Sequence, residues 1–344
     1  MRGTTKKLLA AAALATAVVT ATGGTGAADP TSLPAARDIV GVGDGVTQPL
    51  MNQFSADYNA TIPSSNTTTP RLYSWDATGT SPITTKSGAA SIARPNGAGA
   101  GINVLRNNTG ATVDFVRSER GPASTDPNTF DFVAYARDAV SWAAKSGGNA
   151  PANLTTQNLL DIYTCSITTW DQIDPGLPNT TIKPFLPTGS GTGAIFLSAI
   201  GVSSFGLCVT QGVQENEGSD AQLNDPDALV PYSVGHYIGQ VYFGRGSGTD
   251  VQGPLTIRSV NGIAPVDTVN KVISNALVGT MYSTVLYNVV RDAEWFATDA
   301  HGVALRAVFG RNGWLCTNAT AFADLKSFGF LPLPAFACGS ATHS

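Results

Sequence analysis

The sequence lacks several features that would assign it to a common class. Beyond residue 19, no apolar run reaches the roughly 18 residues that a membrane span needs. There is no Cys-x-x-Cys pair, and the histidines, His236, His301 and His343, are scattered, which excludes the usual zinc sites. Acidic residues outnumber basic ones by 24 to 20, which argues against a nucleic-acid-binding surface. We therefore expect no membrane span, no metal and no nucleic-acid partner.

Recognisable catalytic motifs are missing as well. The Gly-x-Ser-x-Gly nucleophile elbow fails at Ser190, because Thr188 and Thr192 take the glycine positions. No Walker phosphate loop is present, and we interpret His236 as a packed or surface residue rather than a catalytic base. We expect a protein that is not an enzyme and needs no cofactor; a phosphate-ester hydrolase is the least favoured alternative.

The N-terminus has the pattern of a secretory signal peptide. Basic residues come first, an apolar run follows from Leu8 to Val19, and small residues lead up to Asp29. We expect residues 1–28 to be removed and the protein to be secreted, with no lipid anchor, because no cysteine lies near the expected cut. Removal leaves 17 basic residues against 24 acidic ones, a formal charge of −7. The remaining chain is long enough for two domains.

Four cysteines remain after the signal, and they allow three connectivities. An oxidising compartment favours disulfides over free thiols. We expect the pairs Cys165–Cys208 and Cys316–Cys338, because each pair then stays within one local unit of the chain.

Strand-like and helix-like segments alternate along the chain, which predicts an α/β fold with mostly parallel sheets. Asp38–Gly43 is typical of a buried strand, and Leu50, Met51, Phe54 and Tyr58 then recur at helical spacing. Phe130–Trp142 resembles two consecutive strands. Thr155 is expected to be the N-cap of a helix.

Three glycine-rich turns each follow a strand and open a helix: residues 43–47, 96–101 and 186–193. A helix start carries unpaired N–H groups and partial positive charge, so glycines and hydroxyls there can bind a phosphate-like oxyanion. An ordinary cap or a tight turn is the alternative. A second Ser-Gly-Thr, residues 247–249, opens no helix, and we interpret it as a loop. Such turns converge on one crevice of an open α/β sheet.

The segment VDFVRSERGP, residues 113–122, is a strand that ends in charged residues. Arg117 can hold an oxyanion with two hydrogen bonds, and the Glu119 carboxylate can accept a proton from a protonated ligand. A solvated loop with a local ion pair remains the alternative.

These segments resemble the phosphate-type solute-binding proteins of bacterial ABC transporters and their secreted relatives that begin Asp-Ile-Asn-Gly. The best anchors are DIVGVGDGVTQPL, VDFVRSERGP, LTTQNLLDIYTCSITTWDQI and GSGTGAIFLSAIG. The resemblance covers nearly the whole mature chain and implies a two-lobed periplasmic-binding-protein fold of type II. It divides the chain into lobe 1 (29–131 and 284–344) and lobe 2 (132–283). Strands at Phe130–Tyr135 and Ser283–Val290 would cross between the lobes.

The resemblance also implies a ligand-binding set, carried over residue by residue: Gly45, Val46, Thr47, Ala98, Gly99, Glu119, Ser190, Gly191 and Thr192, with Arg117 nearby. Two departures stand out. The family pattern Arg-x-Asp-x-Ser-Gly-Thr has Leu186 and Thr188 at its charged positions, and the acceptor aspartate is Glu119. Losing one charge-assisted contact costs about 1.5–3 kcal/mol. Whether Arg94, Arg117 or Arg120 supplies the missing cation is open.

We predict from this an exported, monomeric protein that captures phosphate or a related oxyanion between two lobes. Glu119 would select a ligand that still carries a proton and so reject sulfate. The resemblance adds an ABC permease as a partner. An extracellular adhesion or sensor protein with the same fold and a degenerate cleft is the alternative.

Overall fold

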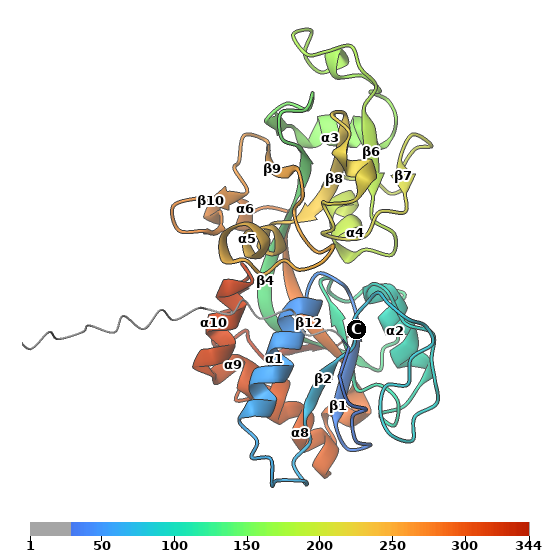
Figure 1. The fold of residues 1–344 in the computed structure, drawn as a ribbon, viewed down its shortest axis with the longest axis vertical. Helices are drawn as coiled ribbons and strands as arrows, with labels where there is room; N and C mark the ends of the chain where they lie inside the picture. Colours follow the sequence, from blue (N-terminus) through green and yellow to red (C-terminus); the bar gives the residue numbers. More distant parts are fainter. Residues whose placement is uncertain (1–28, 344) are drawn as a thin grey trace, which may run out of the picture.

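The computed structural model describes residues 29–343, so the expected signal peptide, residues 1–28, lies outside the described residues. Two bodies follow one another along the long axis and are connected by long strands (Figure 1). We call lobe 1 the elements before residue 130 and after residue 291, and lobe 2 those between residues 146 and 282. This mixed α/β architecture confirms the predicted fold class. Between residues 29 and 343, no helix combines the length and the apolar character that a membrane crossing needs.

Lobe 1 is built on three parallel strands, with β1 in the middle: β1 (Ile39–Gly43), β2 (Leu72–Ser74) and β3 (Phe115–Ser118). Its helices are α1 (Gln48–Ala60), α2 (Ala98–Asn107), α7 (Asp292–Trp295), α8 (Ala300–Phe309), α9 (Trp314–Thr317) and α10 (Ala319–Ser327). The expected stripe on α1, with Leu50 and Phe54 at its centre, is fully buried against α8 to α10 and the sheet. The helix therefore forms where the apolar spacing predicted it, and its start is fixed above the end of β1.

Lobe 2 repeats this plan with parallel strands β6 (Lys183–Leu186), β7 (Thr210–Gln211) and β8 (Ala228–Ser233). Its other strands are β5 (Asn153–Leu154), β9 (Leu255–Val260), β10 (Val266–Asp267) and β11 (Val272–Ile273). Its helices are α3 (Thr156–Tyr163), α4 (Gly191–Ala199), α5 (Val234–Phe243) and α6 (Asn275–Val278), with 3-10 turns η1 (Trp170–Gln172) and η2 (Ala221–Asn224). Thr155 is the N-cap of α3, as predicted, because its side chain accepts a hydrogen bond from the Asn158 amide.

Two antiparallel strands, β4 (Phe130–Lys145) and β12 (Ser283–Arg291), connect the lobes. The interpretation of Phe130–Trp142 as two strands was wrong: β4 is one strand of 16 residues. Its first half pairs with β12 and with the C-terminal strands β13 (Leu331–Pro332) and β14 (Ala341–His343), and its second half pairs with β8 and β9. Residues 133–136 belong to the core of lobe 1 and residues 139–144 to the cores of lobe 2. The predicted lobe boundaries, 131/132 and 283/284, fall at the starts of these two strands and stay a prediction.

Both disulfides are those expected from the sequence. Cys165 pairs with Cys208 in lobe 2, and Cys316 pairs with Cys338 in lobe 1. Each bridge closes a loop within one lobe, so neither restrains the lobes relative to one another.

Candidate functional site

The three glycine-rich turns meet where the two lobes face each other. At Gly97, which precedes α2, a Cβ atom would lie 2.0 Å from the carbonyl oxygen of Gly189 in lobe 2. At Gly191, the first residue of α4, a Cβ atom would lie 2.4 Å from Cγ of Glu119 in lobe 1. Only glycine permits backbones to approach so closely. The starts of α2 and α4 are therefore in direct contact across the cleft.

Polar side chains also join the lobes directly. The Thr192 hydroxyl donates to the Glu119 carboxylate, at 2.9 and 3.1 Å from its two oxygens. The side-chain amides of Asn96 and Gln214 bond each other reciprocally, at 3.0 and 3.2 Å. Each of these pairs has one member in each lobe, so the structure represents a closed cleft.

His236 of α5 adds a third connection between the lobes. Its Nδ1 lies 2.8 Å from the Val46 carbonyl oxygen, and its Nε2 lies 2.5 Å from a carboxylate oxygen of Asp250. A carbonyl only accepts, so Nδ1 carries a proton. Burial opposes the charged form, but the Asp250 carboxylate outweighs it and raises the pKa of His236 to about 9. His236 is thus a packed residue, one of the two placements expected for it.

The start of α1 is already occupied by a carboxylate of the chain itself. Asp44 is fully buried; it accepts the Val46 amide at 2.7 Å and the Thr47 hydroxyl at 2.9 Å. We expected Val46 and Thr47 to face a ligand, and in the closed form both donors are bound by Asp44 instead. Ser190 caps α4 in the ordinary way, since its hydroxyl oxygen accepts the Gly193 amide at 2.9 Å.

Sequence reasoning missed a second carboxylate, Glu215, which lies in the loop after β7. The residue is 6% exposed. The Ser190 hydroxyl and the amides of Gly191 and Gly45 are the donors that face it, but neither of its oxygens completes a hydrogen bond of strict geometry. Burial, with the Asp44 charge in second place, raises the pKa of Glu215 to about 7. Three groups predicted to hold an anion therefore face a carboxylate of the protein.

Asp44, Glu119 and Glu215 form one buried acidic cluster. One oxygen from each lies within 4.8 Å of the others. Burial, and then the charge of Glu215, raises the pKa of Glu119 well above its ordinary value, which favours a protonated carboxyl that donates rather than accepts. Such a cluster can share protons with an oxyanion, and an all-oxygen set of this kind also suits a hard divalent cation.

The arginines do not replace the missing arginine of the family pattern. Arg117 is fully buried. Its Nε donates to the Asp44 carbonyl and its Nη1 to the Ser74 hydroxyl, so it links the first glycine turn to β2. Its Nη2 has no hydrogen-bond partner among the described residues. Arg120 is paired with Asp126, and Arg94 with Asp29.

From the second glycine turn, residues 96–101, we expected Ala98 and Gly99 to contact the ligand. Ala98 is buried at the start of α2, and no side chain caps that helix. Gly99 is exposed and lines a separate hollow with Arg106 and Arg120. Gly99 is therefore not brought to the acidic cluster.

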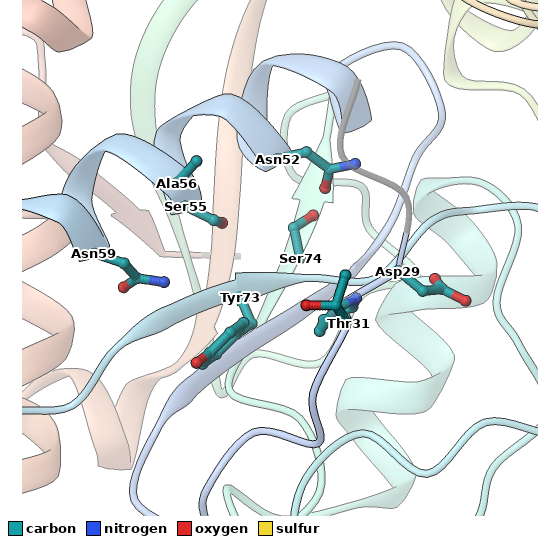
Figure 2. A pocket seen from close by; sticks show the side chains of 9 residues that line it. Asp29, Thr31, Asn52, Ser55, Ala56, Asn59, Tyr73 and Ser74 are labelled. Atoms are coloured by element: carbon teal, nitrogen blue, oxygen red, sulfur yellow. The ribbon is translucent and has the colours of Figure 1, made fainter. Parts of the chain in front are cut away.

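Two cavities help to place the site. A cavity of about 40 Å³ lies beside the cluster, between the first turn and the loop of Glu215. A larger one, about 240 Å³, lies on lobe 1 between α1 and β2. Figure 2 shows Asn52, Ser55 and Asn59 of α1 above Tyr73 in that hollow. Its lining between residues 29 and 343 includes no arginine or lysine.

Comparison with known proteins agrees with this architecture. A model described as "PBP superfamily domain" matches residues 20–228. No curated protein matches the chain. Among solved structures, a putative phosphate ABC transporter substrate-binding protein with bound phosphate from Clostridium perfringens is 13% identical, with a TM-score of 0.59 over 86% of this chain and 100% of that one. An ABC-type phosphate transport receptor from Vibrio cholerae is 17% identical, with a TM-score of 0.56 over 86% of this chain and 100% of that one.

A phosphate-binding protein from Stenotrophomonas maltophilia is 12% identical, with a TM-score of 0.53 over 87% of this chain and 91% of that one. At these identities the likeness establishes the fold. The family match spans more than half of the chain and agrees with the resemblance inferred from the glycine turns. The chain therefore belongs to the PBP superfamily and has the two-lobed fold of periplasmic solute-binding proteins.

Proposed function

We propose that this protein captures phosphate or a related small oxyanion in the cleft between its lobes. The observation that carries the proposal is the meeting of three glycine-rich helix starts, two of which approach so closely that a Cβ atom at Gly97 would lie 2.0 Å from the carbonyl oxygen of Gly189. Helix starts of this kind bind anions through backbone amides and the helix dipole. Structural neighbours named as phosphate receptors support the same ligand class.

The acidic cluster determines which anion fits. Asp44, Glu119 and Glu215 are buried around the site, and Arg117 is the arginine that interacts with them in the part of the chain that the structure describes, through Asp44. An anion without protons would be repelled by whichever of these carboxylates is ionised, whereas phosphate keeps a proton near neutral pH and can donate it to that carboxylate. Sulfate has no proton to donate, so the site is expected to reject it.

A second function is favoured by a different observation. The donors of Val46 and Thr47 are bound to Asp44, and the lobes contact each other directly through Thr192 and Glu119. A cleft of that kind suits an extracellular adhesion or sensor protein that keeps the fold and no longer carries a solute.

Isothermal titration calorimetry on the secreted chain, unfolded and refolded to remove co-purified anions, separates the two functions. We expect saturable binding of phosphate that sulfate does not compete with. Thr192→Val should weaken it by about ten- to 100-fold, since a hydrogen bond to a charged group contributes about 1.5–3 kcal/mol. Thr249→Val, in the Ser-Gly-Thr that opens no helix, is the matched control and should bind like the wild type. No saturable binding, or equal competition by sulfate, would favour the adhesion or sensor role.

The remaining expectations follow from this role. Residues 1–28 would direct export and be removed, an ABC permease would receive the ligand, and the protein would act as a monomer. Mass spectrometry of the secreted protein tests the cleavage near residue 28, and light scattering tests the monomer.

A further inference from the structure

Glu215 lies where a bound anion is expected. We propose that it is an internal occupant of the anion site, so that its carboxylate must withdraw before an oxyanion binds. The proposal rests on the proposed function and deepens it, because it names the residue that sets the affinity of the site.

The first argument is the set of donors that Glu215 faces. A Cβ atom at Gly45 would lie 3.4 Å from Oε2 of Glu215, and the Ser190 hydroxyl and the amides of Gly191 and Gly45 are the donors close enough to act on its carboxylate. Two of these groups belong to the start of α4, a helix of nine residues, and the third precedes α1. A carboxylate and a phosphate interact with a helix start through the same amides and the same dipole. Glu215 therefore makes the approach that the ligand would make.

The second argument is that nothing else explains this position. Glu215 is more than nine-tenths buried, and both of its oxygens lack a hydrogen-bond partner of strict geometry within residues 29–343. No ion pair to it occurs in that part of the chain, and its acidic neighbours are Asp44 and Glu119. Burying a carboxylate that has no ion pair, between two other carboxylates, is unfavourable. Within residues 29–343, the three donors named above are the groups that offset this cost.

The third argument is space. The cavity beside Glu215 has a volume of about 40 Å³, which by this measure holds about three waters. A tetrahedral oxyanion has five heavy atoms and does not fit beside the side chain. Glu215 and the ligand therefore exclude each other in the closed form.

Opening of the cleft separates Glu215 from the part of the anion site that belongs to lobe 1. Gln214, its neighbour in the chain, bonds Asn96 of lobe 1. On its other side, the Asn216 carbonyl accepts from Tyr232 and Gln240 within lobe 2. The loop is thus fixed to lobe 2, and Gln214 and Glu215 reach across to lobe 1. When the lobes separate, Glu215 leaves the amide of Gly45.

Calorimetry with inorganic phosphate at pH 8 tests the proposal. We expect Glu215→Ala to bind phosphate at least tenfold more tightly than the wild type, and Glu215→Gln, which keeps the volume and loses the charge, to lie between them. Asp174→Asn removes the same charge from an exposed position of lobe 2 that does not line the cavity beside the cluster, and should stay within twofold of the wild type. Acetate, a free carboxylate, should compete with phosphate in Glu215→Ala and not in the wild type.

The outcomes separate this proposal from the proposed function. Equal phosphate affinity in the wild type and in both Glu215 variants overturns the internal occupant and leaves phosphate capture standing. Binding by Glu215→Ala alone supports the internal occupant and removes phosphate capture by the wild type. Binding by none of these proteins overturns both. Circular dichroism establishes that each variant is folded, and Glu215→Gln keeps the test valid if the alanine variant is not.

Discussion

The contact between Gly191 and Glu119 leads to the most direct prediction about closure. In Gly191→Ala the new methyl group would lie 2.4 Å from Cγ and 2.5 Å from Oε1 of Glu119. Glu119 is fully buried and bonded to Thr192, so moving its side chain aside breaks that bond. Nonbonded carbons settle at about 3.5–4.0 Å, so a shift of about 1 Å or more is needed, and separation of the lobes supplies it at the cost of the closed contacts. Overpacking of this kind costs about 1–3 kcal/mol, which lowers the population of the closed form about five- to 150-fold.

Small-angle X-ray scattering measures this shift. We expect ligand-free Gly191→Ala to have a larger radius of gyration than the wild type, with an unchanged unfolding temperature, because opening relieves the clash without unfolding either lobe. Gly279→Ala is the matched control, since a Cβ atom there meets nothing within 4 Å and its φ of −81° suits alanine. Identical scattering from all three proteins would refute the reasoning, because it would mean that the closed contact is not populated in solution.

Three further predictions concern stability. The contribution of Glu215 to stability should fall as the pH rises from 4.5 to 7 and stay level above that, because burial raises the pKa of Glu215 to about 7 and the folded form keeps a proton that the unfolded chain has released. His236 should add a further loss up to about pH 9, because Asp250 outweighs burial and raises its pKa to about 9. Urea unfolding at pH 5 and pH 8 should show a smaller loss in Glu215→Gln than in the wild type, and an equal loss in both would contradict the role of Glu215. Replacing Cys165 and Cys208 by alanine should lower the free energy of unfolding by about 4 kcal/mol, the loop-closure value for their separation of 43 residues. A loss below about 1 kcal/mol in denaturant titration would contradict the idea that this disulfide stabilises the fold by restricting the unfolded chain. Lys86→Met should cost about 3 kcal/mol, because it removes the closest ion-pair partner of the buried Asp114 carboxylate and leaves it with His301 at 3.3 Å. The double variant with Asp114→Asn should recover part of this loss, and equal losses in both would show that the ion pair is not the cause.

Much of the fold could be predicted because its signals are local. The apolar stripe of α1 and the cap at Thr155 depend on spacing over a few residues. The long strand β4 could not be predicted, because Arg137 and Asp138 interrupt its apolar pattern. In the structure Asp138 is fully buried where the strand passes from one core to the other, and it accepts the Ser233 hydroxyl and the Gly235 amide. Partners about 95 residues away therefore decide that β4 continues.

The candidate site divides in the same way. The glycine turns were visible because each combines a strand end with a helix start. Asp44 also left a local signal, since an aspartate two residues before the amide it accepts is a common turn motif. Glu215 left no local signal, because its loop shows no periodicity. Its position depends on β7 and on the contact of Gln214 with Asn96, 118 residues away.

The charge balance of the site links these observations to the two substitutions in the family pattern. Leu186 and Thr188 stand where the family has an arginine and an aspartate, so the turn before α4 brings no cation to the ligand. Between residues 29 and 343, Arg117 is the arginine that interacts with the acidic cluster, through Asp44, and the cluster holds three buried carboxylates. An anion that binds adds negative charge to a site that already holds three carboxylates. The repulsion is relieved when protons bind together with the anion or when Glu215 moves out of the site. Affinity for any oxyanion should therefore increase as the pH falls, and the Glu215 variants should lose most of that dependence.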